Sequence, residues 1–263
     1  MAIDHAVHEP NAVLDWRSSS RRAELIAGLL FIVADVAGFA GDALLRSFSG
    51  PDYLTQLYAH GGLAAAGVLA KVIGALACAG IAVAMYQVLK RASAGMALGS
   101  VVFRTLEAAF YLIGAMSLLA LLKLSGQFAV AGVADRASLQ AIGDALLSLR
   151  TYAASLLGVF AFCVGGFLYN LLFFRARLLP RWLSGFGMIA TLALTAACLL
   201  SLFSGNRITS YIPLAFPIFV QELVLAGWLI AKGFDTSAIA AEPVVRGVDL
   251  PHAAVPSVAA GAS

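Results

Sequence analysis

The sequence predicts an all-α membrane protein: a polytopic transmembrane helical bundle of about six spanning helices, with a short amphipathic helix outside the membrane. Three observations predict this fold class. Of the 263 residues, 61% are hydrophobic and 12% are charged, which is about half the charged fraction of a soluble domain. The mean hydropathy of +0.92 would leave a water-soluble fold short of polar surface. Six apolar runs also reach the length of about 20 residues that a spanning helix needs.

The six apolar runs are separated by short polar segments. They lie near Ala23–Leu45, Gly62–Leu89, Met96–Leu122, Tyr152–Phe174, Leu183–Phe203 and Ile212–Ala231. We therefore expect one transmembrane domain over residues 21–233. Residues 1–20 and 234–263 show no usable apolar period, and we expect them to be disordered cytoplasmic tails.

Basic residues in the short loops set the expected orientation, because lysine and arginine mark the cytoplasmic side. Nine lie on the side that holds both termini, against five on the other side. We therefore expect both termini in the cytoplasm and the protein in a bacterial inner (plasma) membrane, with no secretory signal peptide ahead of the first span. The nine are Arg17, Arg21, Arg22, Lys90, Arg91, Arg175, Arg177, Arg181 and Lys232.

The longest segment between spans, on the side away from the termini, contains an amphipathic stretch. Leu139, Ile142, Leu146 and Leu149 recur at helical spacing and predict a helix over 135–150. We favour a helix that lies on the membrane surface. The alternatives are an outward extension of the fourth span and a lid over a cavity.

Small residues recur at four-residue spacing in the first two spans, for example Ala34 with Gly38 and Ala70 with Gly74. This spacing lets helix backbones approach closely in lipid, either within one chain or in a dimer. The three cysteines, Cys78, Cys163 and Cys198, lie inside apolar runs, and we interpret them as small packing residues.

Ionisable side chains within the apolar runs are the sharpest functional signal, since each is costly in lipid and normally faces the bundle interior or water. At about 1.5 Å per residue, Asp35 lies about 18 Å, Arg104 about 12 Å, Glu107 about 16 Å and Glu222 about 15 Å into its span. The middle of a bilayer core is near 15 Å. These four residues therefore form a candidate charged cluster near the membrane midplane.

The formal charge of this cluster is −2, so we expect at least one of its carboxyl groups to hold a proton. Lys71 is a further candidate member, although we favour a stem that reaches out to the interface. Asp42, near the outer end of the first span, is expected to be hydrated. Pro217 should kink the last span close to Glu222.

No pattern typical of an enzyme or a cofactor protein occurs. Three histidines lie in the tails and His60 stands alone, which excludes a haem site with paired histidines. The sequence contains no zinc-protease motif, no nucleophile elbow and no phosphate loop. The net charge of +3 is too small to indicate nucleic-acid binding. We predict no catalytic, cofactor or metal residues, no cofactor, and the lipid bilayer as partner.

Four motifs make the chain similar to a known family. They are Arg22-Ala-Glu-Leu-Ile-Ala-Gly-Leu-Leu, Phe103-Arg-Thr-Leu-Glu-Ala, Leu179-Pro-Arg-Trp-Leu-Ser-Gly-Phe-Gly and Glu222-Leu-Val-Leu-Ala-Gly-Trp-Leu-Ile-Ala-Lys-Gly. On these residues the chain resembles the bacterial membrane family catalogued as domain of unknown function 4386, over roughly Arg21 to Gly233. The resemblance implies a six-span helical protein and brings no reaction, substrate or cofactor.

Several functional interpretations stay open from the residues alone. The charged cluster is either a structural clamp between helices or the site of a proton-coupled or small-solute transporter. A water-accessible cavity that reaches the cluster would favour the transporter. A membrane sensor or a partner-scaffolding module is the other class, and an enzyme is the weakest.

Overall fold

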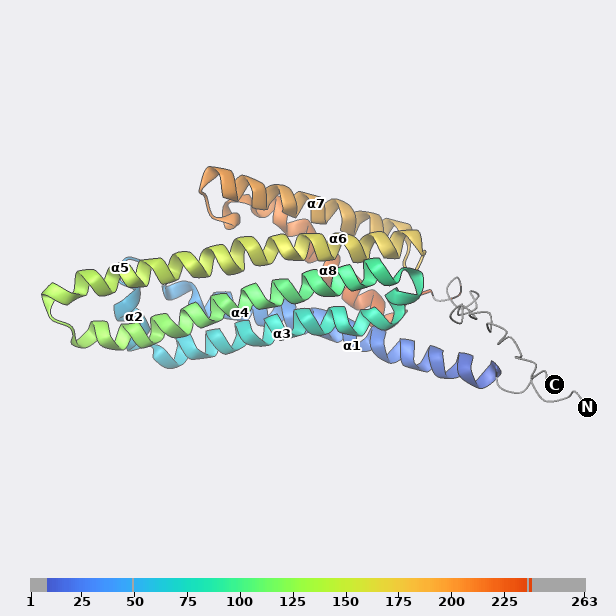
Figure 1. Cartoon of the computed structure of the whole chain (residues 1–263), viewed down its shortest axis with the longest axis horizontal. Coiled ribbons are helices and arrows are strands. Elements are labelled where there is room, and N and C mark those ends of the chain that lie inside the picture. Colours follow the sequence, from blue (N-terminus) through green and yellow to red (C-terminus); the bar gives the residue numbers. More distant parts are fainter. Residues whose placement is uncertain (1–8, 49, 236, 238–263) are drawn as a thin grey trace, which may run out of the picture.

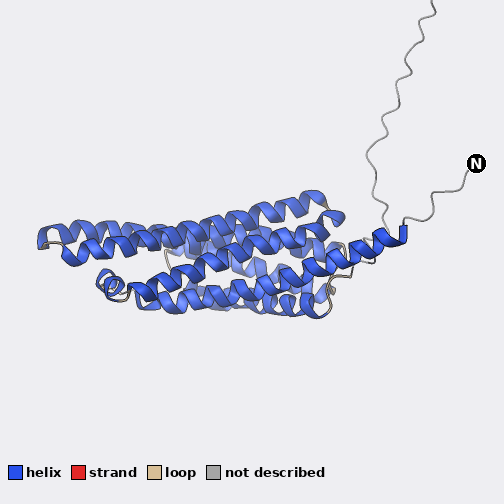
Figure 2. Cartoon of the chain, turned by 90° about the horizontal axis from the view of Figure 1, so that it is seen from below, coloured by secondary structure: helices blue, strands red, loops and turns tan. Residues whose placement is uncertain are grey.

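The computed structural model describes residues 9–48, 50–235 and 237, and this part of the chain is helical and contains no strand. Figure 2 shows the bundle coloured by secondary structure. The predicted all-α fold class is therefore confirmed. The α-helices are α1 (Glu9–Leu45), α2 (Tyr53–Ala59), α3 (Gly61–Ala92), α4 (Ala94–Val130), α5 (Val133–Arg150), α6 (Val159–Arg175), α7 (Arg181–Ser204) and α8 (Ile212–Ala231).

Six helical segments in this part are long and apolar enough to cross a membrane, and each contains one of the predicted spans. They are Ser18–Leu45, Gly61–Ala92, Ala94–Val130, Val133–Arg175, Arg181–Ser204 and Ile208–Ala231.

The six segments form a closed ring in which chain order is also spatial order. Each helix packs against the one before it and the one after it, and α8 returns to pack against α1. Because consecutive spans run in opposite directions, α1 enters and α8 leaves at the same end of the bundle (Figure 1). We call this the terminal end and the opposite one the distal end.

The α1–α3 seam follows the predicted spacing of small residues. A Cβ atom placed on Gly74 of α3 would lie 3.5 Å from the Ala34 carbonyl oxygen and 3.6 Å from the Gly38 nitrogen, both on α1. The two backbones therefore approach closely enough for a single methyl group to bridge them, as this spacing permits within one chain.

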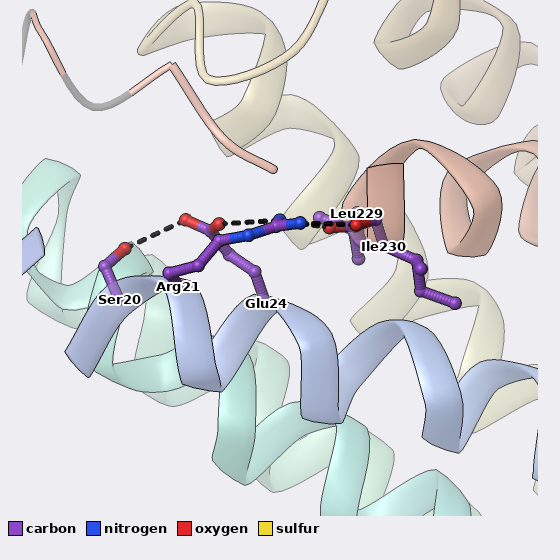
Figure 3. Close-up of polar contacts among 5 residues, drawn as sticks. All are labelled: Ser20, Arg21, Glu24, Leu229 and Ile230. Carbon is purple, nitrogen blue, oxygen red and sulfur yellow. Dashed lines mark hydrogen bonds and ion pairs between the residues drawn. The ribbon is translucent and has the colours of Figure 1, made fainter. Parts of the chain in front are cut away.

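The α1–α8 seam closes the ring through polar contacts at the terminal end (Figure 3). The Arg21 guanidinium on α1 donates hydrogen bonds to the carbonyl oxygens of Leu229, at 2.7 Å, and of Ile230. Glu24 lies 3.4 Å from Arg21 and accepts a hydrogen bond of 2.9 Å from the Ser20 hydroxyl. These carbonyls belong to the last turn of α8 and have no partner inside their own helix, so a side chain of the first helix caps the last one.

The terminal half of the ring is filled by apolar side chains, which we call the terminal plug. Phe31, Val88, Phe173 and Leu229 are each at most 1% exposed in it. All six spans contribute to the plug. Its buried members are Ala27, Phe31, Ile81, Met85, Val88, Leu89, Ala97, Tyr169, Leu172, Phe173, Leu178, Leu179, Leu183, Leu225, Ala226, Leu229 and Phe234.

The distal end carries a helical extension. At about 1.5 Å per residue, the 37 residues of α4 span about 55 Å, well beyond a bilayer core of about 30 Å. The predicted helix is present as α5, but it runs on through the π-helical segment η2 (Thr151–Gly158) into α6 as one helical segment, Val133–Arg175. It therefore extends the fourth span outward, and the favoured position on the membrane surface is wrong.

Part of the apolar face of α5 packs on protein, while Ile142 and Leu149 on the same helix stay exposed. Leu139 and Leu146 contact a second buried cluster that includes Leu54 of α2 and Leu121 of α4. The phenol of Tyr53 on α2, 2% exposed, donates a 3.0 Å hydrogen bond to Asp144. Burial and this carboxylate raise the pKa of Tyr53 well above its ordinary value, so the donor keeps its proton.

The two predicted tails differ from expectation where they are described. The first helix begins at Glu9, so part of the segment 1–20 is helical. After α8, Phe234 is buried against Phe173 with ring centroids 5.2 Å apart. The backbone nitrogen of Asp235 donates to the Leu178 oxygen at 2.8 Å. Residues 1–8, 236 and 238–263, on which the rest of that prediction falls, lie outside the described residues.

Candidate functional site

The ring encloses a cavity of about 490 Å³ in its distal half. Its wall includes residues of all six spans, and it ends distally at Asp42, Arg150 and Thr209, close to where the helices end. The volume is within the range of small-molecule sites, about 300–1,000 Å³. The terminal plug adjoins the floor of the cavity at Phe31, and the cavity extends from there toward the distal end.

The predicted charged cluster surrounds the floor of this cavity. Asp35 of α1, Arg104 and Glu107 of α4, and Glu222 of α8 all line it. Depth along each helix could not show whether these side chains face the same cavity. In the structure, the three helices α1, α4 and α8 bring them together, and the four candidate residues therefore share one cavity.

Arg104 and Glu107 form an ion pair of 3.0 Å and are 1% and 2% exposed. The guanidinium also lies 4.8 Å from the ring centroid of Phe162 on α6, a cation–π contact. Gly165 permits this approach, because a Cβ at that position would lie 3.1 Å from Arg104 Cγ. The pair is intrahelical, so it cannot itself tie one helix to another.

Asp35 and Glu222 are placed differently from that pair. Among the described residues, no basic nitrogen lies within 4.0 Å of either carboxylate. Oδ2 of Asp35 is buried without a hydrogen-bond partner, and Glu222 is half-buried on the cavity wall. Both lie within electrostatic range of Arg104. The floor therefore contains two carboxylates that no direct ion pair neutralises.

The distal part of the cavity has its own charges. Lys71 Nζ lies 2.6 Å from the Asp42 carboxylate and donates to the Gly38 oxygen at 3.0 Å. The stem of Lys71 therefore crosses to α1, and its ammonium group pairs with an exposed acid near the distal end of that helix. The expected reach of Lys71 to the interface stays a prediction. Asp42 is 62% exposed, as expected of a hydrated residue, but it is also the partner of Lys71.

The π-helical segment η2 forms part of the wall and was not predicted. Arg150, which precedes it, and Ala154 and Ser155 within it all face the cavity. A π-helical turn has one residue more than an α-helical turn and occurs frequently at functional sites. The sequence shows only an ordinary apolar run here, so no signal was available for this feature or for the place of Arg150 beside the cavity.

A layer of buried polar side chains lies beneath the floor, toward the terminal plug. Gln221 donates a 3.3 Å hydrogen bond to Asn170, and both are fully buried. The Ser100 hydroxyl, the Tyr169 hydroxyl and Oε1 of Gln221 are buried without a hydrogen-bond partner. Buried polar groups are nearly always paired, so these three atoms need an explanation. Being uncharged, they gave a weaker sequence signal than the ionisable residues.

All three cysteines lie in the described part of the chain. Cys78 lines the cavity, and Cys163 and Cys198 are buried elsewhere. All three are free of disulfides, in agreement with their interpretation as packing residues. Within residues 9–48, 50–235 and 237, no group of three His, Cys, Asp or Glu side chains is placed to hold a metal ion.

Comparison with known proteins gives one family. Residues 26–233 match the family described as "Domain of unknown function (DUF4386)". No curated protein and no solved structure matched the chain. The match covers well over half of the sequence and agrees with the resemblance seen in the four motifs, and so the chain belongs to the DUF4386 family.

Proposed function

We propose that this protein is a proton-coupled carrier of a small polar solute, with the cavity as its solute site. The supporting observation is the one-sided cavity, whose floor is charged and whose other side is closed by the apolar plug. A carrier needs such a site, reachable from one side at a time and near the midplane. We further propose that it has no enzymatic activity, since no nucleophile or metal motif occurs in the sequence.

In this account the carboxylate of Glu222 exchanges a proton, and the ion pair of Arg104 with Glu107 sets how readily it does so. Intramembrane carboxylates commonly serve as proton relays. Glu222 follows Pro217, which stands inside α8 and cannot donate a backbone hydrogen bond there. This break allows the segment that carries Glu222 to change its tilt without unfolding α8.

The unpaired polar layer beneath the floor supports a second conformation. An unsatisfied buried polar group costs about 1–3 kcal/mol. Opening of the terminal plug would expose Ser100, Tyr169 and Gln221 to water or solute and relieve that cost.

The structural clamp is the less favoured interpretation of the charged residues. A clamp requires ion pairs between helices, whereas Arg104 and Glu107 both lie on α4. Glu222 of α8, which would be the partner across the ring, lies beyond ion-pair distance of any base in the described part of the chain.

We place the protein in a bacterial plasma membrane with both termini in the cytoplasm. The support is the excess of lysine and arginine in the loops at the terminal end. In this orientation the cavity faces the outside of the cell.

Proton flux in liposomes tests the proposal. Purified protein is reconstituted with a pH-sensitive dye inside, and a panel of small cations, anions, zwitterions and neutral solutes is added in turn outside. We expect at least one solute to drive proton movement faster than in protein-free liposomes. Glu107→Gln and Glu222→Gln should abolish it, while Asp52→Asn, an exposed acid in the loop before α2, should not. If proton movement with the wild-type protein is no faster than in protein-free liposomes for every solute, the carrier function is refuted.

A further inference from the structure

The cavity contains more acidic than basic side chains, and its charges are unevenly distributed. Four acidic residues line it against three basic ones. The acids are Asp35, Asp42, Glu107 and Glu222, and the bases are Lys71, Arg104 and Arg150. Two of the acids are neutralised by ion pairs with two of the bases: Glu107 pairs with Arg104, and Asp42 pairs with Lys71. Asp35, Glu222 and Arg150 remain.

The three remaining charges lie at different depths. Asp35 and Glu222 are at the floor, within electrostatic range of each other and of the Arg104–Glu107 pair. Arg150 lies near the distal limit of the cavity, because its carbonyl oxygen approaches Gly114, two helical turns beyond Glu107 on α4. The floor therefore has an excess of negative charge. Lys71 and Arg150, the basic groups in the distal part of the cavity, form no ion pair with the carboxylates of the floor.

The floor is a poor site for an anion. Its only base is Arg104, which is 1% exposed, ion-paired to Glu107 and covered by the Phe162 ring. An anion bound there would have to displace Glu107 and approach two further carboxylates. A cation, by contrast, meets Asp35 Oδ2, which is buried without a partner, and the aromatic side chains of Phe31 and Tyr111, which line the same region and favour an ammonium group.

Two adjacent carboxylates in a low-dielectric site cannot both stay ionised without a counter-charge. A proton or a bound cation can supply it, so the two compete for the same oxygen atoms. When an ammonium group binds to a protonated carboxyl group, the carboxyl proton leaves to solvent and the carboxylate pairs with the ammonium. Release of the cation lets the proton return.

We propose that the solute of this cavity is a small organic cation of the protonated-amine class, bound by Asp35 and Glu222 in exchange for a proton. The inference rests on the proposed carrier function and assigns its substrate class and its coupling. The volume of about 490 Å³ sets the size, since a single small amine with a few waters would fill it.

The test is a binding experiment on the purified full-length protein in detergent, with four probes of equal chain length. They are n-butylammonium, n-butyrate, 4-aminobutyrate and butan-1-ol, which carry a positive charge, a negative charge, both and neither. Calorimetry in two buffers of different ionisation enthalpy measures the affinity and the protons released. We expect n-butylammonium to bind most tightly and to release a proton.

Two variants locate the site. Asp35→Asn and Glu222→Gln should each weaken n-butylammonium binding by about tenfold or more, because loss of one partner of a buried charge pair is costly. Asp52→Asn, the same change in an exposed loop, should leave the affinity unchanged. If a variant fails to fold, the wild-type protein still tests the proposal through its pH dependence. Because one proton is exchanged for each bound cation, the affinity for n-butylammonium should fall by about tenfold for each pH unit of acidification.

The outcomes separate this inference from the carrier function. Tighter binding of butyrate, 4-aminobutyrate or butanol, or no binding of n-butylammonium, overturns the cation assignment whatever the flux experiment gives. Binding of n-butylammonium with proton release, but without flux in liposomes, supports the site and refutes the carrier.

Discussion

Arg104 and Glu107 are the most deeply buried charges near the cavity, and each depends on the other. Burying a single charge in a low-dielectric interior is expensive, and a direct partner repays much of the cost. Arg104 also packs on Phe162, whereas Glu107 has no other basic group within ion-pair distance among the described residues. Removing either one leaves the other as an uncompensated charge.

The stability of this pair can be measured with a double-mutant cycle. Arg104→Met and Glu107→Leu should each lower the free energy of unfolding by about 3–5 kcal/mol. The double variant should lose much less than the sum, because no unpaired partner remains. Thermal unfolding in detergent gives the three values, with Glu222→Gln as the comparison that breaks no ion pair. Additive losses would mean that the two residues do not act as a pair.

Sequence reasoning identified the floor of the site but not its other parts. Asp35, Arg104, Glu107 and Glu222 stand out because a charge inside an apolar run is conspicuous and its depth follows from helix rise. The Lys71–Asp42 pair depends on how α3 is rotated against α1, which a single helix does not reveal. Arg150 was expected at the end of a helix on the membrane surface, whereas the continuation of α5 through η2 into α6 corresponds to the alternative of an outward extension of the fourth span.

At the scale of elements, the ends of the helices matter as much as their apolar faces. The last carbonyl groups of α8 would be unsatisfied at the terminal end, and Arg21 of α1 reaches them across the seam (Figure 3). Arg21 thereby links the first span to the last, where the chain itself provides no connection.

The neighbouring arginine offers a matched control for this link. Arg21→Ala should lower the free energy of unfolding by about 1.5–3 kcal/mol, the usual value for a hydrogen bond that involves a charged group. Arg22→Ala removes the same charge from an exposed position beside it and should change stability by no more than about 0.5 kcal/mol. The free energy of unfolding of both variants is measured by urea or thermal unfolding in the same detergent. Equal losses of stability would show that the loss of charge, and not of the hydrogen bonds, is responsible.

The elements themselves were largely predictable, with one instructive exception. Long apolar runs gave all six spans, because a helix in lipid must be apolar over its whole length. The amphipathic pattern of Leu139 and Leu146 predicted the helix α5, but it did not predict what the apolar face of that helix packs against. An apolar helical face has the same sequence pattern whether it covers lipid or, as here, packs against Leu54 and Leu121.

At the scale of the whole molecule, the two ends of the ring differ. The terminal end is closed by apolar side chains from every span, while the distal half encloses the charged cavity. The ring topology permits a change between two such states, because each span packs mainly on the spans before and after it in the ring and can tilt against both. We propose that the plug opens when the cavity closes.

Cysteine accessibility from the two sides tests this claim most directly. In a chain with Cys78, Cys163 and Cys198 changed to alanine, single variants Ser155→Cys in the cavity wall and Ser100→Cys in the layer beneath the floor are treated with a small membrane-impermeant thiol reagent. Both changes replace a hydroxyl by a thiol of similar size, and the cysteine-free parent is the blank. The reagent is added to sealed vesicles of either orientation.

We expect the thiol of Ser155→Cys to react from the distal side only and that of Ser100→Cys to react from the terminal side only. Solutes that support proton flux should change the two rates in opposite directions. A thiol at position 100 that never reacts from the terminal side, with position 155 reactive throughout, would describe a fixed pocket and contradict the account.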